Sequence, residues 1–80
     1  MAHGQPSYPL KDGEVRKQRE LGGMTLRVLA DRCAAAGEPI SNSQLSKIER
    51  GLNRPRPALL VTLASVFGVD VKQLVETSGS

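Results

Sequence analysis

The chain has 80 residues, enough for one small domain, and 39% of them are hydrophobic, so a core can form without a metal or a disulfide. A single cysteine excludes an internal disulfide and a zinc site built from cysteines, and a single histidine leaves too few ligands for a metal centre. No apolar run is long enough for a membrane span and no signal-peptide pattern opens the chain. We therefore expect a cytoplasmic protein that needs no cofactor.

The formal net charge is +3, and the whole positive excess falls in one short segment. Residues 41–56 hold four basic side chains against one acid, namely Lys47, Arg50, Arg54 and Arg56 against Glu49. A local basic cluster on a small domain indicates a polyanionic partner, usually nucleic acid. The alternative is a basic face that meets only solvent, and charge alone leaves both interpretations open.

The two ends of the chain show no hydrophobic periodicity. Residues 1–11 contain Gly and Pro and predict a flexible N-terminal arm, and residues 77–80 are polar and predict a disordered tail. The body, residues 12–76, shows no alternating strand pattern, so we expect one all-α domain there.

The first predicted helix has a thin apolar face. Asp12 is its candidate N-cap, and Gly22 and Gly23 end it. Val15 and Arg19 are four residues apart and therefore share one face.

The second predicted helix follows Thr25, a good N-cap. Its apolar residues have the spacing of a core-facing stripe: Leu26, Leu29, Ala30 and Cys33. We interpret Cys33 as a small buried hydrophobic residue rather than a reactive thiol. The segment Ala34–Pro39 either lengthens this helix or forms a loop.

The third predicted helix has the most clearly marked ends. Ser41 and Gln44 occupy the two positions of a capping box, and Gly51 supplies the stop. Ile40 and Leu45 pair as a hydrophobic staple. Because so few residues of this helix are apolar, most of its surface is left for another contact.

Residues 52–56 predict a loop, and Pro57 suits the first position of a fourth helix. The apolar stripe of that helix is Leu60, Leu63, Ala64 and Phe67. Asp70 caps a short fifth helix, whose apolar residues are Val71, Leu74 and Val75. These three either close the core or offer an apolar surface to a partner.

In this order the elements resemble the lambda-repressor-like helix-turn-helix family, the xenobiotic-response-element type of bacterial and phage regulators. The resemblance runs from Val15 to Leu74. The motifs that carry it are Arg19, Thr25-Leu26-x-x-Leu29-Ala30, the segment from Ile40 to Gly51, the Arg-Pro loop, and Leu60-x-x-Leu63-Ala64-x-x-Phe67-Gly68-Val69. The resemblance implies a compact five-helix DNA-binding domain.

The resemblance also implies that the third helix lies in the major groove of DNA. The base-reading residues are then Asn42, Ser43, Gln44, Ser46 and Lys47. Gln44 either reads a base or serves the capping box. The residues expected at the DNA backbone are Thr25, Arg50, Asn53, Arg54 and Arg56, where the alternative for Arg54 and Arg56 is a solvated loop. Glu49 is implied to pair with Arg19 and so to tie the recognition helix to the body.

The function implied is a sequence-specific regulator that binds double-stranded DNA, most simply a repressor that occupies an operator in a bacterium or phage. A near-palindromic operator requires a homodimer, formed in solution or only on DNA. The candidate interface residues are Leu52, Val71, Leu74 and Val75.

Two departures from the family keep a second interpretation open. Leu26 stands where the family usually places a phosphate-binding Gln, and the turn before the third helix is about five residues longer than the usual three to four. The alternative is an antitoxin or other interaction module that keeps the fold and depends on a protein partner, such as a toxin. An enzyme is not expected, because no nucleophile–base pair or carboxylate dyad is evident.

Overall fold

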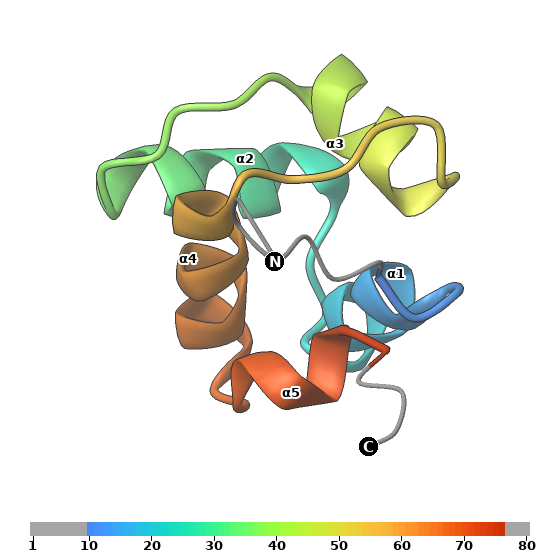
Figure 1. The fold of residues 1–80 in the computed structure, drawn as a ribbon. Coiled ribbons are helices and arrows are strands. Elements are labelled where there is room, and N and C mark those ends of the chain that lie inside the picture. Colours follow the sequence, from blue (N-terminus) through green and yellow to red (C-terminus); the bar gives the residue numbers. More distant parts are fainter. Residues whose placement is uncertain (1–9, 77–80) are drawn as a thin grey trace, which may run out of the picture.

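The computed structural model describes residues 10–76, so the tail predicted at 77–80 and most of the predicted arm lie outside the described residues. Within residues 10–76 the chain forms five helices and no strand. They are α1 (Glu14–Leu21), α2 (Leu26–Ala35), α3 (Asn42–Glu49), α4 (Pro57–Phe67) and α5 (Val71–Leu74). The prediction of an all-α, five-helix domain is confirmed, and Figure 1 shows these helices arranged around one interior.

Side-chain caps begin α2, α3 and α5 as the sequence predicts. Thr25 Oγ1 accepts from the Val28 N–H (3.1 Å), Ser41 Oγ from the Gln44 N–H (3.1 Å), and Asp70 Oδ1 from the Lys72 N–H (3.0 Å). The cap predicted at Asp12 is wrong. Helix α1 begins after Gly13, which has a left-handed φ of 73°, and the Glu14 N–H donates to the Lys11 carbonyl (3.1 Å). A backbone turn, which glycine adopts at little cost, replaces the side-chain cap.

The core is built from one inward face of each of the longer helices. Leu29 of α2, Leu45 of α3 and Leu63 of α4 are 0% exposed, and Val15 of α1 packs among the same buried residues. Burying each such side chain contributes about 1.5–3 kcal/mol. Leucines from three helices therefore fix the position of α3 relative to α2 and α4.

Cys33 is expected to resist a thiol reagent until the protein unfolds. The side chain is fully buried on α2, and this burial raises the pKa of its thiol, with the negative charge of Glu38 adding to the effect. The thiolate is the reactive form, so modification by a disulfide reagent should be slow in native buffer and fast in denaturant. Rapid modification of the native protein would contradict the buried placement.

The raised pKa of Cys33 also makes the stability of the fold depend on pH. Because the folded protein favours the neutral thiol, Cys33 contributes fully to the free energy of unfolding below the pKa of the unfolded thiol, and this contribution is lost as the pH rises through the higher pKa of the folded protein.

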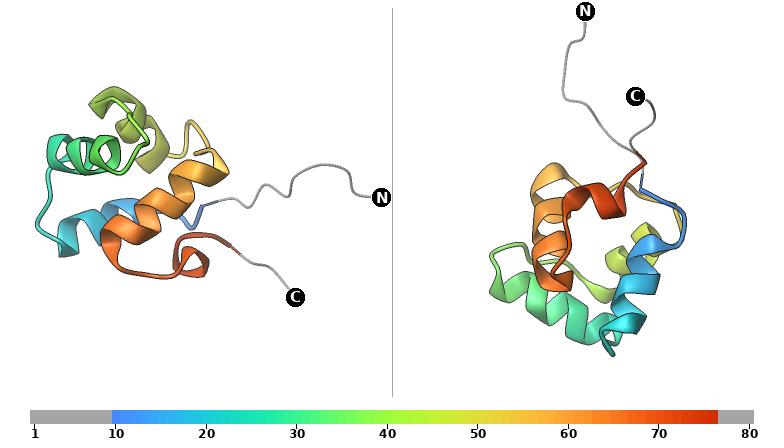
Figure 2. Two further views of the ribbon diagram at one scale, coloured as in Figure 1. Left: turned by 90° about the vertical axis from the view of Figure 1, so that its left-hand side faces the viewer. Right: turned by 90° about the horizontal axis from the view of Figure 1, so that it is seen from below.

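Backbone contacts join the two ends of the described chain. Leu10 forms an isolated antiparallel bridge with Val75, and the Lys11 N–H donates to the Leu74 carbonyl (2.8 Å). Figure 2 shows this first segment running beside the end of the chain. Leu10 and Lys11 therefore belong to the fold, and the boundary of the arm predicted at residue 11 is too late.

The connection between α2 and α3 is long, as predicted, and part of the extra length is helix. Helix α2 continues to Ala35, and six residues, 36–41, lead to α3. The helix ends in a Schellman motif: Gly37 has φ 94°, its N–H donates to the Ala34 carbonyl (3.0 Å), and the Glu38 N–H donates to the Cys33 carbonyl (2.9 Å). The connection of six residues is thus longer than the usual three to four, but the excess is smaller than the sequence predicts.

Candidate nucleic-acid interface

The outer face of α3 is polar and open to solvent. Asn42, Ser43 and Lys47 are exposed and Ser46 is half-buried, whereas the inward residues of the helix are buried in the core. The hydrophilic face singled out from the sequence therefore points away from the interior, and Figure 1 shows α3 at one edge of the molecule. Polar side chains of this kind, held on a rigid helix, can form hydrogen bonds with the edges of bases in a major groove.

Gln44 is exposed, but its side chain belongs to the helix cap. Its Oε1 accepts from the Ser41 N–H (3.3 Å) and from the Ser41 hydroxyl (3.4 Å), so both halves of the predicted capping box are present. Reading an adenine needs the amide oxygen and the amide nitrogen together. The cap and a two-point base contact by Gln44 therefore exclude each other.

A partly buried ion pair ties the C-terminal part of α3 to α1. Arg19 Nε lies 2.7 Å from Glu49 Oε2 and Arg19 Nη2 lies 3.2 Å from Oε1, while Nη1 donates to the Met24 carbonyl (2.9 Å). The side chains are 13% and 6% exposed. The hydrogen bonds to Glu49 raise the pKa of Arg19, and burial opposes this. The carboxylate of Glu49 is thus neutralised beside the basic surface, as the resemblance implied.

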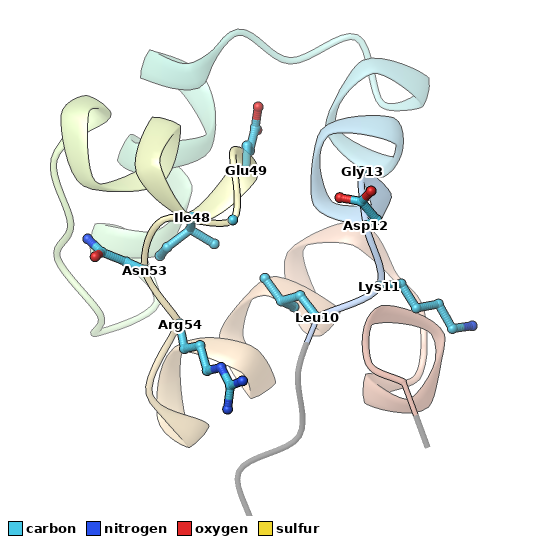
Figure 3. Close-up of a pocket in the computed structure, with 9 residues that line it drawn as sticks. Leu10, Lys11, Asp12, Gly13, Ile48, Glu49, Asn53 and Arg54 are labelled. Atoms are coloured by element: carbon cyan, nitrogen blue, oxygen red, sulfur yellow. The ribbon is translucent and has the colours of Figure 1, made fainter. Parts of the chain in front are cut away.

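The loop that follows α3 carries Asn53, Arg54 and Arg56, three of the residues expected at the DNA backbone. Gly51 has φ 78°, and the Leu52 N–H donates to the Lys47 carbonyl (2.8 Å), which turns the chain sharply out of the helix. Asn53 and Arg54 are exposed and help to line a hollow between this loop and residues 10–13 (Figure 3). Two polar residues are therefore presented beside the end of α3.

Arg56 is engaged within the chain. Its Nη2 lies 2.7 Å from Glu38 Oε1, in the turn that precedes α3. Sequence reasoning assigned Arg56 to phosphate or solvent and gave Glu38 no role. The two residues are 18 positions apart, on segments without periodicity, so no pattern in the sequence pointed to their contact.

The other residues expected to contact the DNA backbone lie at the start of α2 and the end of α3. The Thr25 oxygen accepts a hydrogen bond as a cap, which leaves its hydroxyl hydrogen to donate, and Arg50 is exposed at the end of α3. Leu26 is half-buried against the core. Leu26 therefore adds to the apolar packing, and its side chain offers no hydrogen bond to a phosphate.

The candidate dimer residues do not share one surface. Leu74 and Val75 lie in the core of the monomer, where α5 packs against α4 and α1 and Leu10 bridges to Val75, so they are corrected to core residues. Val71 is half-buried, and Leu52 is exposed. The other exposed large apolar residues, Leu21, Val28 and Val61, were not expected from the sequence, because they fall outside any apolar stripe.

The described residues, 10–76, contain no cluster of three or more potential metal ligands. None of the helices in this part of the chain has the length and apolar character needed to cross a bilayer.

Comparison with known proteins agrees with this geometry. A family model described as Helix-turn-helix matches residues 15–74. Two proteins of Mycobacterium tuberculosis, from strains CDC 1551 / Oshkosh and ATCC 25618 / H37Rv, are each named an uncharacterized HTH-type transcriptional regulator. Each is 34% identical over 65 residues, covering 81% of this chain and 43% of the relative, so the chain spans less than half of their length. The chain belongs to the helix-turn-helix family, in its lambda-repressor-like form.

Proposed function

We propose that this chain is a transcription regulator that binds double-stranded DNA in a sequence-specific manner and acts as a repressor by occupying its operator. One observation carries the proposal: the polar face of α3 is turned to solvent while the helix is locked to the body by the Arg19–Glu49 pair. A rigid, outward, hydrophilic helix beside a basic loop is what major-groove recognition requires.

Within this proposal, Asn42, Ser43 and Lys47 read base edges, with Ser46 beside them. Asn pairs with adenine through one donor and one acceptor, and Lys donates to guanine O6 and N7. Arg50, Arg54 and the Thr25 hydroxyl hold the phosphates and set the register. Gln44 keeps the helix cap and reads no base.

One such domain makes few base contacts, so the proposal includes a homodimer on a near-palindromic operator, with half-sites about 34 Å apart. Of the interface residues expected from the sequence, Leu52 is exposed and lies in the loop that follows the recognition helix. The location proposed is the cytoplasm, where such a regulator meets DNA.

Binding to a random duplex is expected to weaken steeply with salt. The logarithm of the binding constant should fall with the logarithm of the salt concentration, with a slope of about −0.9 for each phosphate neutralised. Arg54→Ala should weaken binding to all sequences alike and reduce the slope by about 0.9. Lys72→Ala is the matched control, because Lys72 is an exposed cation on α5, away from α3. Anisotropy titrations at two or more salt concentrations measure both quantities.

A second candidate function is that of an antitoxin or other interaction module. Leu21, Leu52 and Val61 are exposed apolar side chains that a protein partner could cover. Absence of duplex binding even at low salt would favour this second function and overturn the first.

A further inference from the structure

Two loops flank the recognition helix, and one ion pair joins them. Glu38 lies in the turn that leads into α3, and Arg56 closes the loop that leads out of it. Glu38 Oε1 and Arg56 Nη2 are 2.7 Å apart, within the range of a charge-assisted hydrogen bond. The side chain of Glu38 is mostly covered, with 20% exposed, whereas that of Arg56 is 70% exposed.

Both partners are attached to fixed backbone. The Glu38 N–H closes the Schellman motif of α2 through the Cys33 carbonyl (2.9 Å). Arg56 is the N-cap of α4, and its carbonyl accepts from the Leu60 N–H (3.0 Å). The ion pair therefore connects the C-terminal end of α2 to the first turn of α4, and we call it the Glu38–Arg56 clasp.

The clasp lies close to the start of α3 in the chain. Only Pro39, Ile40 and Ser41 separate Glu38 from the first residue of the helix. The far end of α3 is held by the Arg19–Glu49 ion pair, whereas its start is held by apolar contacts, with Ile40 packed against the core and Leu45 buried. The clasp adds a polar attachment in the turn just before the base-reading residues begin.

We propose that Glu38 is a positioning residue for DNA recognition: through Arg56 it fixes the long turn and so sets the angle at which α3 presents Asn42 and Ser43. This inference rests on the proposed DNA-binding function. It assigns Arg56 to the clasp rather than to a phosphate contact.

The rival explanation is that Arg56 contacts a phosphate and Glu38 merely reduces its charge. Arg56→Gln would then weaken binding to all duplexes alike and lower the salt slope by about 0.9. Glu38→Gln would strengthen binding to all duplexes alike, because an acid is removed from the surface near DNA. The clasp predicts neither result.

The test compares a duplex selected from a randomised pool by the wild-type protein with a random duplex of the same length. Glu38→Gln and Arg56→Gln should each lower the ratio of the two affinities about threefold, which is about 0.7 kcal/mol and within the range of an exposed ion pair. Arg56→Gln should leave the salt slope on the random duplex unchanged.

The charge swap Glu38→Arg with Arg56→Glu should restore most of the ratio of the two affinities. Uniform changes in both affinities, or a swap no better than the single variants, would overturn the proposal.

Glu20→Gln is the matched control, because Glu20 is an acid in an exposed ion pair with Arg16 on α1, and the ratio should not change. Melting temperatures should stay close to that of the wild type in all variants, since exposed ion pairs contribute little to stability.

Amide hydrogen exchange on the free protein separates this inference from the function it rests on. The Gln44 and Leu45 N–H groups, which donate to the Ser41 side chain and carbonyl, should exchange faster in Glu38→Gln and not in Glu20→Gln. Unchanged exchange would refute the clasp even if the wild type binds DNA. A wild type that binds no duplex would refute the DNA-binding function and the role in recognition, while exchange would still decide whether the clasp orders the turn.

Discussion

Replacing Arg19 with Ala is expected to lower the free energy of unfolding by about 3–5 kcal/mol. The substitution removes both hydrogen bonds to Glu49, whose side chain is only 6% exposed, and also the donor to the Met24 carbonyl. A mostly covered carboxylate left without its partner is costly because it regains only part of its hydration. Natural domains are stable by about 5–15 kcal/mol, so this loss would take a large part of the total. Urea unfolding followed by circular dichroism, without DNA, measures it.

Arg16→Ala is the control for that experiment. Arg16 is on the same helix and also pairs with an acid, but its side chain and that of Glu20 are 66% and 56% exposed. Its removal should change stability by no more than about 0.5 kcal/mol. Replacing Arg19 and Glu49 together by Met should recover much of the loss, since two apolar side chains leave no unpaired charge. Equal effects of Arg19→Ala and Arg16→Ala would contradict the structural role of the pair.

The fold was predictable where local chemistry decides it. Thr25, Ser41 and Asp70 cap helices because a short side-chain oxygen next to a free backbone N–H stabilises the same turn in any tertiary setting. The polar face of α3 followed from periodicity in the same way. The Arg19–Glu49 pair depended on the family resemblance, because its partners are 30 positions apart and only the fold brings them together.

What the sequence did not determine depends on contacts between distant segments. Whether Leu74 and Val75 close the core or face a partner depends on how α5 packs against α4 and α1, and on the bridge from Leu10, whose segment has no helical pattern of its own. The Glu38–Arg56 contact joins two loops, whose conformations no periodic pattern specifies. In both cases the deciding interaction is tertiary, and local propensity carries no information about it.

Replacing Lys47 with Ala is expected to remove discrimination at one operator position, by about 1–3 kcal/mol. Lys47 is exposed on the outer face of α3, one turn beyond Ser43, so in the proposed pose its ammonium reaches a guanine edge. The measurement is the affinity for a selected duplex and for its single-base variants. The variant protein should bind the selected duplex more weakly and lose its preference at one symmetric pair of positions, with preferences elsewhere unchanged.

Arg54→Ala is the control that is needed to interpret the effect of Lys47→Ala. Both changes remove one positive charge from the same exposed surface, so their general electrostatic effects on DNA binding are similar. Only a base contact converts that loss into a change at particular positions, because phosphates are the same in every sequence. If Lys47→Ala weakened all duplexes alike, as Arg54→Ala is expected to do, Lys47 would hold the backbone. Sequence reading would then rest on Asn42 and Ser43, nearer the start of α3.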